Sequence, residues 1–233
     1  MRSVRSMLIS ALMVSAPLWL AGAAPAQQTE RQAATPKMKY DFAPVRIPPA
    51  AAEKALKTFA ALLNKDNFRS LGFRELGEGQ RATLGTPVEE FMIRLDELAK
   101  YTAGQEPSQL LHRTERVTVP VLAGQQPQSS LTMTRKGGDW EASGFGASNY
   151  SRLLSETRER LAKQEGRSGA EYFEVRVPAL NVSFLGAVSG GRLVFTPLLK
   201  DARFGFEAGK PLAADQALLK LVPAAKEHNR QPT

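Results

Sequence analysis

The stretch VTVPVLAGQQPQSSLTMTRKGGDWEASGF, residues 117–145, decides the fold of this chain. It begins and ends with alternating apolar and polar residues, which is typical of strands that have one face in the core. Gly137 and Gly138 lie between two such parts, and glycine can take the positive φ angles that a tight hairpin turn requires. An earlier reversal is expected at residues 123–128. The stretch therefore predicts two successive hairpins of an antiparallel sheet.

Centring the tight turn on Gly137 and Gly138 determines which residues face each other across the hairpin. The predicted pairs on one face are Arg135 with Trp140, Met133 with Ala142 and Leu131 with Gly144. The predicted pairs on the other face are Lys136 with Asp139 and Thr134 with Glu141. The first face is largely apolar and the second is polar, so we expect one face to be buried and the other to be in water.

A second hairpin is predicted where a Gly-Gly pair at residues 190–191 separates two apolar stretches. Unlike the first hairpin, it is apolar on both faces, and soluble monomers rarely leave such a face uncovered. Helices of the same chain, chiefly residues 212–226, or another protein must therefore cover it. We expect a protein partner or a second copy to dock on the outer face, which carries Leu185, Ala187 and Val194.

Helical spacing of apolar residues predicts three helices besides these strands. They cover residues 49–64, 148–163 and 212–226, and two further strands are predicted at residues 89–95 and 171–177. The fold class is therefore α+β, with an antiparallel sheet of Gly-Gly-turned hairpins and helices packed on one face. The two further strands share residue types. This similarity leaves two possibilities: two related halves at residues 48–146 and 147–233, or one domain over residues 48–226. The layout resembles cystatin-like helix-on-sheet modules, and this resemblance implies no activity or residue role.

The N-terminus has the pattern of a secretory signal peptide. Two arginines precede an apolar run at residues 7–20, and Ala-Pro-Ala at residues 24–26 matches the small-residue cleavage pattern. We predict a signal peptide over residues 1–26, a flexible polar leader over residues 27–47 and an exported chain that begins at Gln27. The apolar run is too short for a comfortable membrane span. We therefore expect a bacterial periplasmic or secreted protein with no transmembrane segment after cleavage.

The residue inventory argues against most catalytic and metal chemistry. The chain has no cysteine, and its two histidines, His112 and His228, leave few ligands for zinc. Ser189 lies among glycines in a hairpin turn, whereas a nucleophile elbow needs a strand-to-helix turn. The adjacent carboxylates Glu89 and Glu90 point to opposite faces of a strand and cannot easily act together. We predict no catalytic residue, no metal and no cofactor, and we do not favour an enzyme.

The chain is basic, with a formal net charge of +8 at pH 7, but it has no dense basic tract. We therefore do not expect it to bind nucleic acid. The reversal at residues 123–128 predicts a patch for an anionic envelope polymer, made of Arg113, Arg116, Arg135 and Lys136. The alternative is local: Arg135 stacks over the tryptophan opposite it, and Lys136 pairs with Asp139.

The sequence leaves two functional hypotheses open. The first is an exported, non-enzymatic binding or envelope assembly factor that acts through its sheet on an unknown protein partner, on itself or on an anionic polymer. The second is a ligand-binding or carboxylate-dependent hydrolytic pocket between helix and sheet. A deep cleft with two or more ionisable groups would favour the second hypothesis, and a shallow apolar surface would favour the first.

Overall fold

The computed structural model describes residues 37–146 and 148–229, which belong to one compact unit of the chain. The predicted signal peptide and its cleavage site lie outside the described residues, as does the first part of the predicted leader. Within these described ranges, no helix is both long enough and apolar enough to cross a membrane.

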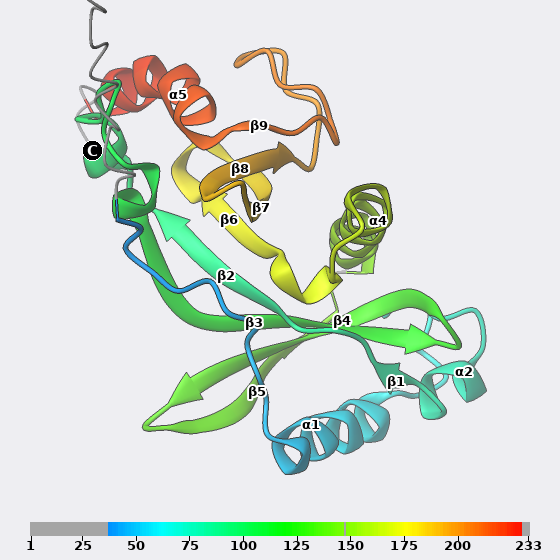
Figure 1. Cartoon of the computed structure of the whole chain (residues 1–233). Coiled ribbons are helices and arrows are strands. Elements are labelled where there is room, and N and C mark those ends of the chain that lie inside the picture. The colour runs from blue at the N-terminus through cyan, green and yellow to red at the C-terminus, as the bar shows by residue number, and fades with distance from the viewer. Residues whose placement is uncertain (1–36, 147, 230–233) are drawn as a thin grey trace, which may run out of the picture. The chain divides into compact units, whose positions relative to one another are not determined.

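In the described part of the chain, nine strands form one mixed sheet with the order β5-β4-β3-β2-β6-β7-β8-β9, and β1 pairs with β3 (Figure 1). The strands are β1 (Thr83–Leu84), β2 (Val88–Ile93), β3 (Leu111–Ala123), β4 (Gln126–Lys136), β5 (Asp139–Phe145), β6 (Phe173–Val177), β7 (Val182–Ser189), β8 (Arg192–Pro197) and β9 (Leu212–Ala213). The α-helices are α1 (Pro49–Leu62), α2 (Leu76–Gln80), α3 (Leu95–Leu98), α4 (Ser148–Glu165) and α5 (Ala214–His228). This arrangement confirms the predicted α+β class.

Both Gly-Gly hairpins form, β4 with β5 and β7 with β8. The observed pairs of the first hairpin include Lys136 with Asp139, Arg135 with Trp140, Thr134 with Glu141 and Met133 with Ala142, as predicted. Beyond them the register shifts, and Leu131 lies opposite Phe145 instead of Gly144. A bulge of this kind adds one residue to one strand, and the alternation of residue types does not reveal it.

The sheet is mixed rather than antiparallel throughout, because β2 and β6 pair in parallel. Glu90 lies opposite Glu174, and Phe91 lies opposite Val175. Parallel neighbours need a long crossover connection, and the segment that contains β3, β4, β5 and α4 supplies it. The two strands that the sequence assigned to separate halves are therefore neighbours in one continuous sheet.

The apolar face of the first hairpin packs on α1. Phe59 of α1 is fully buried and shares a core cluster with Val119 of β3 and Met133 of β4. Trp140 packs against the same cluster and is only partly buried. The alternation along β3 and β4 thus places one face in the core, as expected. The other face is exposed at Lys136 and Asp139, near the turn, but farther along β4 it is not in water, because Ser130 is buried and α4 packs on β4.

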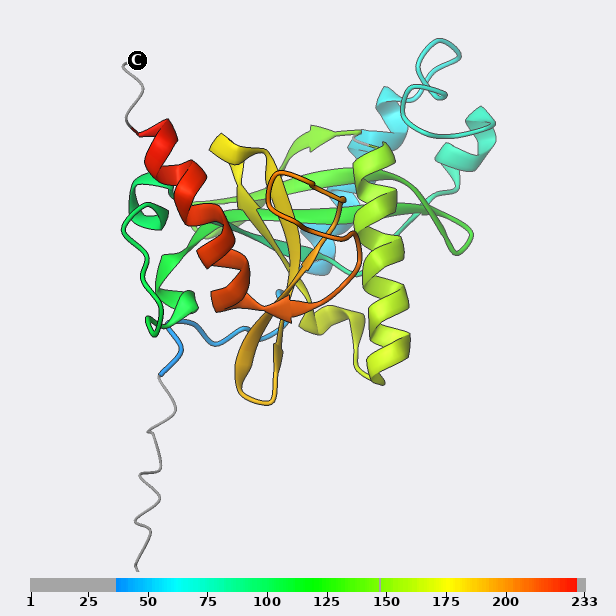
Figure 2. The ribbon, with the colours of Figure 1, turned by 90° about the horizontal axis from the view of Figure 1, so that it is seen from above.

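Helices of the same chain cover both faces of the second hairpin. Phe184 and Phe195 belong to a core cluster that includes Leu218 of α5. Leu185, the neighbour of Phe184, belongs to a different cluster together with Leu154 of α4. Neighbouring residues of a strand point to opposite faces, so α5 and α4 lie on opposite faces of β7. Figure 2 shows β7 and β8 between these two helices.

Residues 37–47 differ from the predicted flexible leader, because they pack on the sheet. Phe42 stacks on Phe173 with the ring centroids 4.6 Å apart, and the ring of Tyr40 lies 5.4 Å from that of Phe91. Each such aromatic pair adds to the free energy gained by burial. The segment is polar on average, so its composition does not indicate that Tyr40 and Phe42 anchor it. The ring contacts of these two residues hold the segment on the sheet.

Candidate functional site

Two glutamates from neighbouring strands lie side by side beneath α4. Glu90 of β2 and Glu174 of β6 are paired in register, and their side chains are 9% and 1% exposed. Both point to the sheet face that α4 covers, because Leu185, the antiparallel partner of Glu174, packs against α4. Burial of two carboxylates is costly unless hydrogen bonds or opposite charges compensate for it.

Three further side chains compensate these carboxylates, and we call the five residues the glutamate–arginine cluster. Tyr150 of α4 donates a hydrogen bond from its hydroxyl to Oε1 of Glu174 at 2.5 Å. Arg176 donates from Nη1 to Oε2 of Glu90 at 3.2 Å, and its Nε lies 3.6 Å from Oε1 of Glu174. Arg116 places Nη1 3.9 Å from Oε1 of Glu90. The cluster thus joins β2, β3, β6 and α4.

Burial and charge together shift the pKa values in the cluster. Burial raises the pKa of the Glu174 carboxyl; the Tyr150 hydrogen bond opposes this rise, and the negative charge of Glu90 adds to it. Burial also raises the pKa of the Tyr150 hydroxyl, and Glu174 raises it further, so Tyr150 remains a donor. Burial lowers the pKa of Arg176, but the two glutamates outweigh this effect and raise it overall. Perturbed groups of this kind mark candidate functional sites.

The raised pKa of Glu174 predicts a pH-dependent stability that Glu174→Gln removes. Above the ordinary pKa of 4.5, the unfolded chain releases this proton while the folded chain retains it. The free energy of unfolding therefore falls as the pH rises from 4.5 toward the folded-state pKa. Glutamine keeps an acceptor for Tyr150 but carries no charge. In chemical melts, the variant should gain stability relative to the wild type as the pH rises above about 4.5.

An exposed glutamate on α4, the helix that covers the cluster, supplies the control for this experiment. Glu159 lies on the outer face of α4, and Glu159→Gln should leave the pH dependence of the wild type unchanged. If the stability of Glu174→Gln followed the same pH dependence as that of the wild type, the carboxyl of Glu174 would not carry the effect.

A pocket of about 340 Å³ opens beside the cluster. Tyr150 and Arg176 line it, together with Ser183 of β7 and residues from the segment after β8. The side chain of Arg176 is 41% exposed, whereas that of Glu174 is 1% exposed. The cluster therefore presents the guanidinium of Arg176 to the pocket and keeps its carboxylates behind it.

The structure separates the four basic residues of the predicted anion patch. Arg113 pairs with Glu89, its Nε lying 2.7 Å from Oε1. Arg116 belongs to the glutamate–arginine cluster, on the other face of the sheet. Arg135 lines a second pocket together with Arg113, and Lys136 is exposed beside the hairpin turn. Two of the four residues therefore share a pocket, and a single patch of four does not form.

The local alternative for these residues differs from the structure as well. Arg113, rather than Arg135, lies over an aromatic ring, with its guanidinium carbon 5.3 Å from the ring centroid of Tyr40. Lys136 and Asp139 lie opposite each other, but no ion pair joins them in the described residues. Arg135 consequently has neither a carboxylate nor an aromatic ring as a close partner within the described ranges.

The predicted docking face is covered by the chain itself, so the expectation of a partner there is wrong. Leu185 and Ala187 are 1% and 5% exposed and share a core cluster with Leu154 of α4. Val194 is partly buried and pairs with Ala213 of β9. The sequence predicted a helix at residues 148–163, close to α4, but did not indicate which face of the sheet this helix would cover.

The sequence does not reveal the cluster, because the members of the cluster are far apart in the chain. Glu89 and Glu90 do point to opposite faces: the first binds Arg113 and the second binds Arg176. The residue that lies beside Glu90 is Glu174. The sequence predicted the strand that carries Glu174, but not that this strand would pair with β2. The one feature of the sequence that points to the cluster is a glutamate in each of two otherwise apolar strands, Glu90 in β2 and Glu174 in β6. No group of three or more His, Cys, Asp or Glu in the described residues could hold a metal ion.

Comparisons with protein-family models, with curated proteins and with solved structures found no match for this chain. The resemblance of the layout to cystatin-like modules gains no support from them. The geometry of the cluster and of its pocket therefore carries the functional argument.

Proposed function

We propose that the protein is an exported ligand-binding protein that holds a small organic anion in the pocket beside the glutamate–arginine cluster. The observation that carries this proposal is the position of Arg176. Its partly exposed side chain lines the pocket, and two buried glutamates contact its guanidinium. The signal-peptide pattern at residues 1–26 supports the exported location.

The lining of the pocket favours a ligand that is rich in hydrogen-bond acceptors. Arg176 and Lys200 carry only donors, and the hydroxyl of Ser183 can donate. The carboxylate that lines the pocket, Asp201, already accepts a hydrogen bond from Nη2 of Arg203 at 2.6 Å. A carboxylate or phosphate group would gain charge-assisted hydrogen bonds from these donors. The volume of about 340 Å³ lies in the range of small-molecule sites.

The buried glutamates are suited to orienting Arg176. They contact Nη1 and Nε of its guanidinium, and Nη2 has no hydrogen-bond partner within the described residues. Because the guanidinium is planar, contacts on one edge also determine where the other edge points. An arginine that is already held loses little side-chain entropy when a ligand binds.

A carboxylate-dependent hydrolase is the second candidate, and one observation favours it. Burial raises the pKa of Glu174, so its carboxyl keeps a proton to a higher pH than an exposed glutamate does, and it lies beside the carboxyl of Glu90. General acid–base hydrolysis needs such groups within reach of the substrate. Neither glutamate lines the pocket, whereas Arg176 and Tyr150 do. Binding is therefore the better supported of the two functions.

Calorimetric titration of the purified protein with citrate, glucose 6-phosphate and inorganic phosphate tests the binding function. At least one of these probes should bind with a Kd of about 1 mM or below. Arg176→Lys keeps the charge but loses the planar fork, and it should weaken binding about tenfold. Ser183→Ala should weaken binding severalfold, and Ser189→Ala, at the exposed end of the same strand, should leave it unchanged.

Two results would contradict this function. One is the absence of binding for all three probes, and the other is equal affinity in Arg176→Lys and the wild type. Hydrolysis of nitrophenyl ester or phosphate substrates that Glu174→Gln abolishes would support the hydrolase instead.

A further inference from the structure

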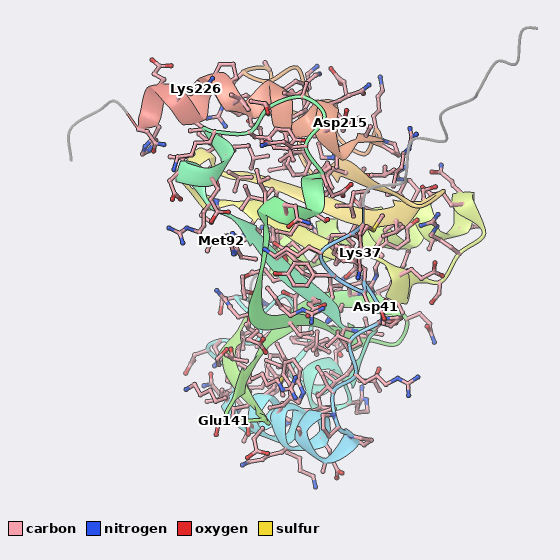
Figure 3. All side chains as sticks on the ribbon, turned by 60° about the vertical axis from the view of Figure 1, so that its left-hand side comes forward. Lys37, Asp41, Met92, Glu141, Asp215 and Lys226 are labelled. Atoms are coloured by element: carbon pink, nitrogen blue, oxygen red, sulfur yellow. The ribbon has the colours of Figure 1, made fainter. Side chains whose placement is uncertain are left out.

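A second pocket lies on the opposite face of the sheet from the glutamate–arginine cluster. Its volume is about 450 Å³, and we call it the Trp140 groove. Glu89 lines the groove, whereas its neighbour Glu90 belongs to the cluster, and neighbours in a strand point to opposite faces. The N-terminal segment forms one wall, and Figure 3 labels Asp41 on this segment where it crosses the sheet. The two pockets share no lining residue.

Most of the charged side chains in the Trp140 groove have no ion pair or hydrogen bond with another described residue. One ion pair is present, between Arg113 and Glu89. The lining side chains with no ion pair or hydrogen bond to any described residue are Asp41, Arg46, Glu115 and Arg135. The groove therefore combines guanidinium groups, which only donate hydrogen bonds, with carboxylates, which only accept them. These two arginines and two carboxylates together carry no net charge.

Glu115 reaches the groove from a strained backbone position. Its φ angle is +57°, in the left-handed region that residues with a side chain rarely occupy. It lies where β3 bulges against β2: Glu89 is opposite Val117, but Phe91 is opposite Arg113. Bulges and strained residues of this kind are frequent beside functional sites. Here the bulge places a carboxylate among the arginines of the groove.

Trp140 supplies an aromatic surface at the same place. It is the cross-strand partner of Arg135, and it packs against the core cluster beneath α1. Part of its side chain remains exposed and lines the groove. A tryptophan held by packing offers its ring to a ligand at little entropic cost.

We propose that the Trp140 groove is a carbohydrate-binding site. Each sugar hydroxyl both donates and accepts hydrogen bonds, so one sugar can satisfy the arginines and the carboxylates together. The C–H-rich face of a sugar ring can pack against the indole of Trp140. The volume of about 450 Å³ suits a short oligosaccharide. An anionic polymer fits less well, because the carboxylates of the groove would repel it.

Tryptophan fluorescence reports directly on this groove. The chain has two tryptophans, so the full chain carrying Trp19→Phe retains Trp140 alone. Titration with cellotetraose, chitotetraose and maltotetraose should produce a saturable change in emission for at least one sugar, with a Kd of about 1 mM or below. Arg135→Ala and Glu115→Gln should each weaken that binding about tenfold. Arg192→Ala, at an exposed position on β8, should not change it.

The two groove substitutions separate a sugar from a charged ligand. A sugar loses hydrogen bonds in both variants, whereas an anion would bind more tightly once Glu115 is neutralised. Arg46→Ala gives a further test outside the sheet, and it should weaken sugar binding as Arg135→Ala does. The proposal would be overturned if none of the three sugars changed the emission. Binding of polyglutamate that Glu115→Gln strengthens, without any binding of the sugars, would also overturn it.

Discussion

Leu185→Glu should unfold the protein. Leu185 is 1% exposed, lies opposite Glu174 in the sheet and packs with Leu154 of α4. The loss of a buried leucine side chain alone costs about 2–5 kcal/mol, and an uncompensated buried charge adds to it. Together these terms approach the whole stability of a typical domain, about 5–15 kcal/mol. Far-ultraviolet circular dichroism in denaturant should show a strongly lowered midpoint or no cooperative transition.

An exposed leucine provides the matched control. Leu199 is 63% exposed, and Leu199→Glu should change the free energy of unfolding by less than about 0.5 kcal/mol. If Leu185→Glu were folded and as stable as this control, α4 would not cover the Leu185 face, and that face would again be a candidate surface for a partner.

Gly186→Ala should destabilise the protein, although alanine in a strand is usually better than glycine by about 0.5–1 kcal/mol. A Cβ at this position would overlap Cε2 of Phe173 and lie 2.8 and 2.9 Å from Cζ and Cδ2. The ring has little room to move, because Phe173 is 4% exposed and stacks on Phe42. Overpacking of this kind costs about 1–3 kcal/mol, and we expect a value near the upper end in urea melts.

Gly144 of β5 provides a control that shows whether the contact with Phe173 causes the loss of stability. A Cβ on Gly144 would meet the side chain of Thr132 at 3.5 Å, an ordinary distance, so Gly144→Ala should be neutral or slightly stabilising. The double variant Phe173→Leu with Gly186→Ala should lose less free energy of unfolding than the sum of the losses in the two single variants. The reason is that the smaller side chain at position 173 relieves the overlap. Equal midpoints for Gly186→Ala and the wild type would show that this strand tolerates a side chain.

Local patterns in the sequence were sufficient for most of the elements. The Gly-Gly pairs marked both tight hairpin turns, since few other residues adopt the backbone angles of such turns. Helical spacing located α1 at Pro49–Leu62 and α4 at Ser148–Glu165, close to the predicted residues 49–64 and 148–163. The third helix was placed two residues early, because Leu212–Ala213 pair with β8 as β9 before α5 begins.

The candidate site was less accessible from the sequence. Arg116 and Arg135 were selected as neighbours, and the hairpin does bring them close, but they project to opposite faces of the sheet. The sequence places Glu90 only beside its chain neighbour Glu89, and it does not indicate Glu174 or Tyr150 as site residues. The bulge that brings Glu115 into the Trp140 groove leaves no mark in the alternation of β3.

By itself, the sequence determined the longer strands, the two Gly-Gly turns and the three long helices of this protein, because each depends on residues close together in the chain. Only the tertiary structure decided that β2 and β6 are parallel neighbours and that α4 covers the Leu185 face. An apolar stripe shows that a helix must pack on something, but not on which face of which strand. That choice depends on burial and chain connection over the whole unit. The same choice brought Glu90 and Glu174 together beneath Tyr150, and so created the site.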